Sequence, residues 1–445
     1  MGQQCLLPRN PPPGPRISVS PRTSDMILEN SRVDRLLNTI DVSPVFGYIV
    51  DGRLDPDRLK FALEQVFRHF STLRARMCRN GKQLMISENH GDMELFSWTV
   101  EDHMVPMSSM FKVLPRTDEI SVSLFDIAER QNFYIPLKST VVRRPSVADE
   151  CSPLMEVRVQ LFTDKTVIGL SWNHLLTDGS GMSIILSSWI KALKGDPLPE
   201  VASNKDPFKA FYGSNPTPPC AAVIPGITKI FQIGFTMITE LIRYGPPQAR
   251  SIFIPNSVLA QWKSASDRVS TNDLITAWLL KAWASTASSG KVSIITIMDL
   301  RKHLPQVVPP TYLRNASSAR PSPHTLEVKD INKMSQLEVA EVIRSFVKHF
   351  VPEVELNFQS YEERNGITRM APKAKWIIAL SSWSRFNLPQ MDFGAKTESF
   401  EGGNRRNREY GNVGCVWLED EGARIIFWMS KRRWNMGVWR SLRRL

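Results

Sequence analysis

Residues 171–179 carry the side chains in this sequence that are best suited to acid–base chemistry. His174 follows an apolar run, and Asp178-Gly179 comes four residues later, at the start of an amphipathic segment. An imidazole with a pKa near ~6.5 can accept a proton at neutral pH and return it. His174 is therefore a candidate general base. Taken alone, a histidine that is hydrogen-bonded within the core is the other interpretation of the same residue.

Asp178 has two interpretations of its own. It stands where the N-cap of a helix over residues 179–194 is expected, and aspartate is among the best N-cap residues. Its carboxylate could instead pair with a cation. We therefore favour an orienting role for Asp178 over proton transfer.

Other catalytic patterns are missing from the sequence. It has no G-x-S-x-G nucleophile elbow and no H-E-x-x-H zinc motif, and its other histidines do not cluster along the chain. Gly290-Lys291 lacks the earlier glycine and the following hydroxyl residue of a phosphate-binding loop. The sequence thus gives no support to metal-dependent or nucleotide-hydrolysing chemistry.

Four segments, taken together, resemble fungal members of the BAHD family of acyl-CoA-dependent acyltransferases. They are His174-x-x-x-Asp178-Gly179, which resembles HxxxDG; Ser270-Thr271-Asn272-Asp273, which resembles STND; Asp299-x-Arg301 with Pro309-Pro310-x-Tyr312-x-x-Asn315-Ala316; and Ser381-Ser382-Trp383, which leads to Asp392-Phe393-Gly394. One HxxxD match is weak evidence. All four in the family's order make a chance agreement remote.

The resemblance implies a fold and an activity. The fold would be α/β, a two-lobed chloramphenicol-acetyltransferase-like structure with mixed β-sheets, flanking helices and a central channel. The chain would hold no permanent cofactor and would use acyl-CoA as co-substrate, with a hydroxyl or amine of a small molecule, a secondary metabolite, as acceptor. The family is mostly monomeric, so we expect a monomer.

The resemblance also implies roles for particular residues. His174 would be the general base, Asp178 would pair with Arg301, and Ser381 and Trp383 would stabilise the oxyanion. The coenzyme phosphates would contact Lys263, Arg268, Ser270, Thr271 and Asn272, because a helix N-terminus attracts anions. For Ser381 and Trp383, simple packing at a strand end remains an alternative, and for the coenzyme set a solvated basic surface does.

One segment departs from the family pattern. After Asp392-Phe393-Gly394 the family has Trp-Gly-Lys-Pro, whereas this chain continues with Ala395-Lys396-Thr397. The motif is taken to be structural in the family. The change is therefore expected to affect lobe packing or a loop near the coenzyme, and not the chemistry.

The elements that must position these residues follow from hydrophobic periodicity. Helices are expected over 56–73, 179–194, from 271 onward and over 332–350, and strands over 155–161, 167–172, 292–299, 376–381, 413–418 and 424–429. A proline-rich stretch separates two such sets. We therefore expect an N-terminal lobe (1–196) with the HxxxD motif, a crossover (197–250) and a C-terminal lobe (251–445) with the DFG motif.

Composition sets the remaining bounds. The 445 residues are 42% hydrophobic and 22% charged, as in globular proteins, and 56 Lys and Arg against 44 Asp and Glu give a net charge of +12. This excess would suit the phosphates of acyl-CoA. Five scattered cysteines, no signal-peptide pattern and no apolar run long enough for a transmembrane segment favour a cytoplasmic protein.

Three other functions fit the sequence less well. A nucleic-acid binder is disfavoured, because the basic carboxy-terminal cluster comes with no nucleic-acid-binding signature. A catalytically inactive relative that only binds acyl-CoA is disfavoured, because both His174 and Asp178 are present. A peptide-assembly condensation domain shares the fold, yet Asn173 stands where that class has a second histidine.

Overall fold

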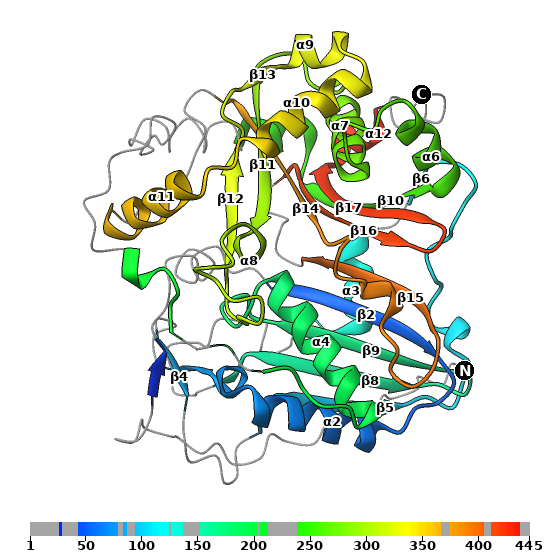
Figure 1. Ribbon diagram of the computed structural model, residues 1–445. Helices are drawn as coiled ribbons and strands as arrows, with labels where there is room; N and C mark the ends of the chain where they lie inside the picture. The colour runs from blue at the N-terminus through cyan, green and yellow to red at the C-terminus, as the bar shows by residue number, and fades with distance from the viewer. Residues whose placement is uncertain are drawn as a thin grey trace, which may run out of the picture.

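Two α/β lobes lie one above the other in the computed structural model (Figure 1). The structure describes residues 26–28, 43–78, 83–86, 94–123, 126–136, 152–200, 202, 205–211, 238–365, 374–404 and 411–436. Each lobe is built on its own sheet, and helices cover the sheets.

The lower lobe in Figure 1 is built on a five-stranded sheet with the order β15-β2-β9-β8-β5. Its strands are β2 (Pro44–Asp51), β5 (Ser97–Asp102), β8 (Met155–Leu161), β9 (Lys165–Trp172) and β15 (Thr397–Asn404). Helices α2 (Pro56–His69) and α4 (Gly179–Lys194) pack together on one face. Helix α3 (Ile127–Tyr134) contacts the sheet at β2 and β9. A small antiparallel sheet, with the order β1-β4-β3-β7, completes this lobe.

A pair of glycines explains how α3 approaches the sheet. Gly47 of β2 and Gly169 of β9 face each other in the antiparallel register. A Cβ atom at Gly47 would overlap the ring of Tyr134, and one at Gly169 would overlap the Tyr134 backbone. The end of α3 therefore packs directly against the sheet and buries the second face of the sheet.

The upper lobe is built on an eight-stranded sheet with the order β12-β11-β14-β16-β17-β10-β6, and β13 also pairs with β11. Its strands are β6 (Ser121–Val122), β10 (Pro247–Pro255), β11 (Lys291–Asp299), β12 (Ser317–Pro321), β13 (Leu326–Glu327), β14 (Trp376–Ser382), β16 (Val413–Glu419) and β17 (Gly422–Ser430). β11, β14 and β16 run parallel to one another, and the other pairs are antiparallel.

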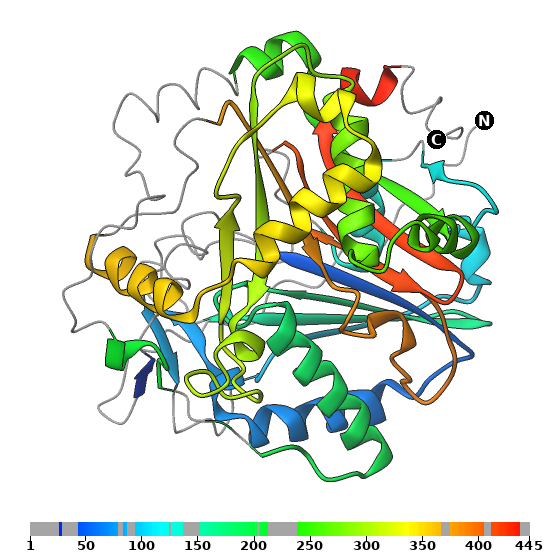
Figure 2. The same ribbon diagram turned by 45° about the horizontal axis from the view of Figure 1, so that its top comes forward.

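Helices pack on the upper sheet, where α7 and α10 lie side by side (Figure 2). The helices of this lobe are α6 (Asn256–Ser264), α7 (Thr271–Ala284), α8 (Leu300–His303), α9 (Val328–Lys333), α10 (Gln336–Lys348), α11 (Pro352–Asn365) and α12 (Lys431–Asn435). The shorter elements of the chain are β1 (Met26–Leu28), β3 (Arg76–Cys78), β4 (Gln83–Ile86), β7 (Ser152–Pro153), η1 (Ser71–Arg74), η2 (Met107–Ser109), η3 (Lys209–Phe211) and η4 (Leu388–Gln390).

Local side-chain bonds start the helices where the sequence predicts. Asp55 accepts from the backbone N–H groups of the first turn of α2, and Asp178 does the same for α4. Ser270 and Asp273 form a reciprocal capping box at the start of α7. These predicted helix starts are confirmed.

Two predicted elements need correction. Strand β8 is not half-buried, because its polar residues are covered as well: Gln160 is 1% exposed and its amide donates to Phe133 O at 2.7 Å. The helix expected over 332–350 is α10, which starts later, at Gln336, because α9 ends at Lys333 and Ser335 forms a capping box with Glu338.

The two sheets exchange strands across the division expected from the sequence. β15 comes from the last quarter of the chain but pairs with β2 in the lower lobe. In return, β6 pairs with β10 in the upper lobe. The boundaries at 196 and 250 stay a prediction, and much of the crossover (212–237) lies outside the described residues. Among the helices that the structure does describe, none is both long and apolar enough to cross a membrane.

Candidate active site

His174 lies in the turn that joins β9 to α4. The Trp172 indole N–H donates to Thr177 O at 3.2 Å, and Asn173 Oδ1 accepts from the Leu175 N–H at 3.0 Å. These two bonds close the turn around His174. The imidazole itself is only half-buried.

Asn315 orients the imidazole from the upper lobe. Its Nδ2 donates to His174 O at 2.8 Å, which turns its Oδ1 toward the ring, 3.1 Å from His174 Nδ1. Because this oxygen can only accept, Nδ1 must carry the proton of a neutral imidazole. Nε2 is then the basic nitrogen. The sequence motif contains Asn315, but the motif alone assigned it no role.

The Asp178 carboxylate is fully used by other groups. It is 1% exposed and accepts from Gly181 N at 2.9 Å, Ala316 N at 2.8 Å and Ser317 Oγ at 2.9 Å. Its fourth donor is Arg301 Nη1 at 3.0 Å. Burial alone would raise the pKa of Asp178, but the Arg301 charge and these hydrogen bonds hold the pKa below its ordinary value. Asp178 is thus placed to hold the turn, and not to transfer a proton.

Arg301 joins the strand ends of the upper lobe to this turn. Besides Asp178, its guanidinium donates to Asp299 Oδ1 at 3.0 Å, Tyr312 O at 2.7 Å and Arg314 O at 2.6 Å. Burial tends to lower the pKa of Arg301, yet the two carboxylates raise it above its usual range. The group therefore stays charged.

A second set of contacts ties the loop after β14 to the first turn of α4. Asp299 Oδ2 accepts from Ser180 Oγ at 2.8 Å and lies 3.4 Å from Arg385 Nη2. The ring of the next residue, Phe386, lies against Gly179, where an added Cβ would be 3.0 Å from it. The sequence motifs gave no reason to single out Arg385.

Ser381 and Trp383 are brought together at the end of β14. The Trp383 indole N–H donates to Ser381 Oγ at 3.1 Å. The Trp383 ring packs edge-on against Phe46, whose ring packs in turn against Trp172, two residues before His174. Because the Ser381 oxygen accepts this bond, its hydroxyl proton can be donated elsewhere. The arrangement supports Ser381 as a hydrogen-bond donor toward the site, with the Trp383 N–H holding the serine oxygen in position.

The sheet topology explains why these residues meet. β11 and β14 are parallel neighbours, so Asp299 and Ser382 end them at the same sheet edge. β12 is antiparallel to β11 and begins there with Ser317. This edge faces the lower lobe, and α8 lies beside the start of α4 in Figure 1. The site therefore takes residues from both lobes.

The predicted coenzyme contacts lie on a different segment, around the α6–α7 connection. They are Lys263, Arg268, Ser270, Thr271 and Asn272, and within the described chain their hydrogen bonds stay inside α6, α7 and the loop between them. Lys263 Nζ donates to Ser266 O and Val269 O. Ser270 is engaged by the Asp273 carboxylate, which already faces the helix N-terminus. The structure does not bring this set into contact with His174.

The Asp392-Phe393-Gly394 motif packs in the lower lobe. The Phe393 ring lies between Tyr48 and Trp189, with centroid distances of 5.0 and 5.1 Å. Asp392 pairs with Lys194 at the end of α4, at 2.8 Å. The motif thus fastens α4 to the sheet.

The segment that departs from the family pattern comes directly after Phe393-Gly394 in the chain. Gly394 has a φ of +105°, a left-handed conformation that favours glycine, and its N–H donates to Asp392 Oδ1 at 3.0 Å. Ala395 then packs against the same core as Phe393. Ala395 therefore contributes to core packing, and it is far along the chain from the His174 turn.

Comparison with known proteins identifies the family of the chain. The model of the Transferase family matches residues 122–436, which include every residue of the His174 site named above apart from Phe46. The chain belongs to this BAHD-type acyltransferase family. The resemblance found in its motifs is therefore confirmed.

Several of the relatives are fungal acetyltransferases by name. The chain is 21% identical to acetyltransferase pyiB of Pyricularia grisea, over 64% of this chain and 63% of that protein. It is 23% identical to O-acetyltransferase PaAT-2 of Phomopsis amygdali, over 62% and 61% respectively. The chain thus matches about three fifths of the length of these relatives.

A solved structure shows the fold. TRI101 of F. sporotrichioides, crystallised with coenzyme A and T-2, superposes with a TM-score of 0.69 at 13% identity, over 95% of this chain and 97% of that one. The expected two-lobed α/β fold is confirmed. The central channel stays a prediction.

Proposed function

We propose that this chain transfers an acyl group from acyl-CoA to a hydroxyl or amine of a small molecule, with His174 as general base. The observation that carries the proposal is the Asn315–His174 pair, which leaves Nε2 as the basic nitrogen. Membership of the acyltransferase family supplies the reaction class.

The proposed reaction starts with proton removal by His174 and ends with release of the coenzyme thiol. His174 Nε2 takes the proton of the acceptor while the acceptor oxygen or nitrogen attacks the thioester carbonyl carbon. The carbonyl electrons move onto its oxygen, and the Ser381 hydroxyl donates a hydrogen bond to that oxyanion. The oxyanion electrons then re-form the carbonyl as the C–S bond breaks, and sulfur leaves with the electron pair of that bond and takes the proton from the imidazolium. Proton transfer of this kind contributes about 10²–10⁴-fold to a rate.

Neighbouring groups keep the imidazole in place during these steps. Asn315 Oδ1 continues to accept from Nδ1–H when Nε2 is protonated, so the imidazolium keeps its orientation. The Asp178–Arg301 pair holds the turn without exchanging protons with the substrate.

The names of the relatives narrow the substrates. Both similar fungal proteins are acetyltransferases, one of them an O-acetyltransferase, and TRI101 was crystallised with coenzyme A. We therefore propose acetyl-CoA as donor and a hydroxyl-bearing secondary metabolite as acceptor. The coenzyme contacts predicted at Lys263, Arg268 and the start of α7 remain part of the proposal, supported by the positive end of the helix dipole at Ser270. A monomer in the cytoplasm remains part of the proposal.

The test is release of free thiol from a panel of acyl-CoA donors with mixed alcohol and amine acceptors. We expect turnover with acetyl-CoA and an alcohol, and a loss of about 10²–10⁴-fold in His174→Ala. His69→Ala, at an exposed histidine of α2, is the matched control and should keep wild-type turnover. Turnover that survives unchanged in His174→Ala would remove this residue from the mechanism.

A further inference from the structure

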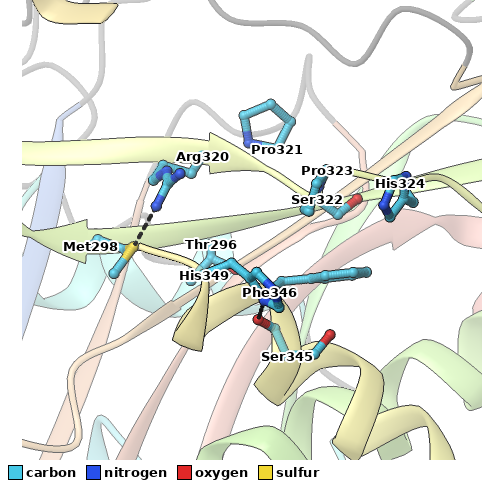
Figure 3. Close-up of a pocket in the computed structure, with 10 residues that line it drawn as sticks. All are labelled: Thr296, Met298, Arg320, Pro321, Ser322, Pro323, His324, Ser345, Phe346 and His349. Carbon is cyan, nitrogen blue, oxygen red and sulfur yellow. Dashed lines mark hydrogen bonds between the residues drawn. The ribbon is translucent and has the colours of Figure 1, made fainter. Parts of the chain in front are cut away.

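A pocket in the upper lobe is not used by the proposed reaction. It has a volume of about 250 Å³ and lies between β11, β12 and the last turn of α10 (Figure 3). Its wall includes Met298, Pro321, Pro323 and Phe346, which give it a mostly apolar surface. Small-molecule sites are concave and largely apolar, with a few polar groups that fix orientation.

The polar groups of the pocket are the basic side chains of Arg320, His324 and His349 and the hydroxyls of Thr296, Ser322 and Ser345. Arg320 and His324 stand at opposite ends of the group of side chains in Figure 3, and His349 lies between them. All ten residues that line the pocket are described, and none is an aspartate or glutamate. An apolar cavity with basic groups and no acid is suited to an amphipathic anion.

Arg320 is held rigidly at its end of the pocket. Its Nε lies 3.5 Å from Oε2 of the buried Glu355, and its guanidinium lies over the Phe350 ring, 5.1 Å from the centroid. Glu355 is itself fixed by Ser318 Oγ at 2.8 Å. Glu355 fixes the guanidinium of Arg320, so Arg320 contributes N–H donors in a set position.

His349 has one ring nitrogen assigned. Its Nδ1 lies 2.6 Å from Ser345 O, which can only accept, so Nδ1 carries a proton. Nε2 is the nitrogen left for a ligand: it accepts from a ligand hydroxyl when the ring is neutral and donates to an anion when the ring is protonated. His324 and His349 are both exposed at the surface of the lobe. Substituting them therefore removes little packing.

We propose that this pocket binds a small organic acid, with an apolar or aromatic body against Met298 and Phe346 and one anionic group held by Arg320 and His349, while His324 lines the other end. The site goes beyond the acyl transfer proposed for His174. It is nevertheless close to that machinery along the chain. Met298 precedes Asp299, and Arg320 shares β12 with Ser317, whose hydroxyl donates to Asp178.

The probes are benzoate, phenyl phosphate and the neutral benzyl alcohol, each titrated calorimetrically into the full chain with saturating coenzyme A. Coenzyme A occupies the donor side of the proposed catalytic site, and the histidine variant described below decides whether the remaining heat comes from this pocket. We expect one saturable site for at least one anion, and benzyl alcohol to bind about tenfold more weakly, as one lost charged hydrogen bond predicts. The tighter of the two anions identifies a carboxylate or a phosphate ester as the natural group.

The variant that tests the location is His324→Ala combined with His349→Ala. It should weaken the anion about tenfold and leave benzyl alcohol unchanged. Arg320→Gln is avoided because it would leave Glu355 buried without its cation, and His69→Ala serves as the control outside the pocket. The proposal is overturned if neither anion binds saturably, if benzyl alcohol binds as tightly, or if the double variant binds as the wild type does.

Discussion

At the residue scale, the hydrogen bond from Trp383 to Ser381 links two side chains, so that Trp383 acts through Ser381. The indole N–H points at the serine oxygen, so the Ser381 hydroxyl is the group that can reach an oxyanion. The motif resemblance implied that Ser381 and Trp383 both donate directly to the oxyanion. The geometry instead makes Trp383 a positioning residue whose effect passes through Ser381.

The series arrangement predicts non-additive losses. Ser381→Ala should lower kcat by about 10²–10³-fold, as does removal of an oxyanion donor. Trp383→Phe keeps the ring packing and removes only the N–H, so its loss should be about tenfold, equal to one hydrogen bond. The double variant should be no worse than Ser381→Ala. Steady-state kinetics decide, and losses that multiply would show that the two act independently.

The Asp178 carboxylate predicts a particular pH dependence of stability. Its pKa is lower in the folded chain than in the unfolded chain, where it is about 3.9. The stabilisation is therefore fully present above that value and is lost as the pH falls through the folded-state pKa. Asp178→Asn should reduce the free energy of unfolding by about 3 kcal/mol at pH 7, the lower end for a broken buried pair, because Asp299 still contacts Arg301.

Urea unfolding at a series of pH values between 7 and 3 measures this difference. The gap between wild type and variant should narrow as the solution is acidified, since protonation removes the charge in the wild type as well. A gap that stays constant down to pH 3 would contradict the assignment. Asp392→Asn is a useful comparison, because that exposed carboxylate also has a lowered pKa, caused mainly by its hydrogen bond with Lys194, and should alter stability far less.

At the scale of elements, the first turn of α4 packs against the upper lobe without space for an added methyl group at Gly181. A Cβ on Gly181 would overlap Thr177 Oγ1 and the Leu313 carbonyl oxygen. Gly181→Ala should therefore lower the free energy of unfolding by about 1–3 kcal/mol and reduce kcat, because it forces the helix start away from Asn315. Chemical denaturation and kinetics measure both. Ser187→Ala, at an exposed position of the same helix, should change neither.

The same elements show what the sequence could and could not predict. The starts of α2, α4 and α7 depend on bonds within four residues, so Asp55, Asp178 and Ser270 were readable as caps. Ser335 and Glu338 carry the same local signal, and it was missed inside a longer apolar pattern. The covered polar face of β8 was not readable, because its bonds reach another element at Phe133.

The candidate site divides in the same way. Motif resemblance pointed to His174, Asp178, Arg301, Ser381 and Trp383, and the structure places the first three in one turn-and-strand cluster and the last two in direct contact. The partner of the imidazole was not predictable, because Asn315 lies 141 residues away and the two meet only when the lobes pack. Arg385 depends on the same packing.

At the scale of the whole molecule, β15 makes the two lobes one cooperative unit. Its Phe400 ring packs against Phe46 and Tyr48 of the lower sheet, with centroid distances of 5.2 and 5.0 Å, and against Trp417 of the upper sheet at 5.2 Å. Phe400→Ala should therefore reduce stability by about 3–5 kcal/mol in both lobes together. Native-state hydrogen exchange at β9 and β11 measures each lobe separately, and the most protected amides of the two strands should lose equal free energies of opening. A loss confined to β9 would mean that the lobes unfold independently and that the strand exchange couples them only weakly.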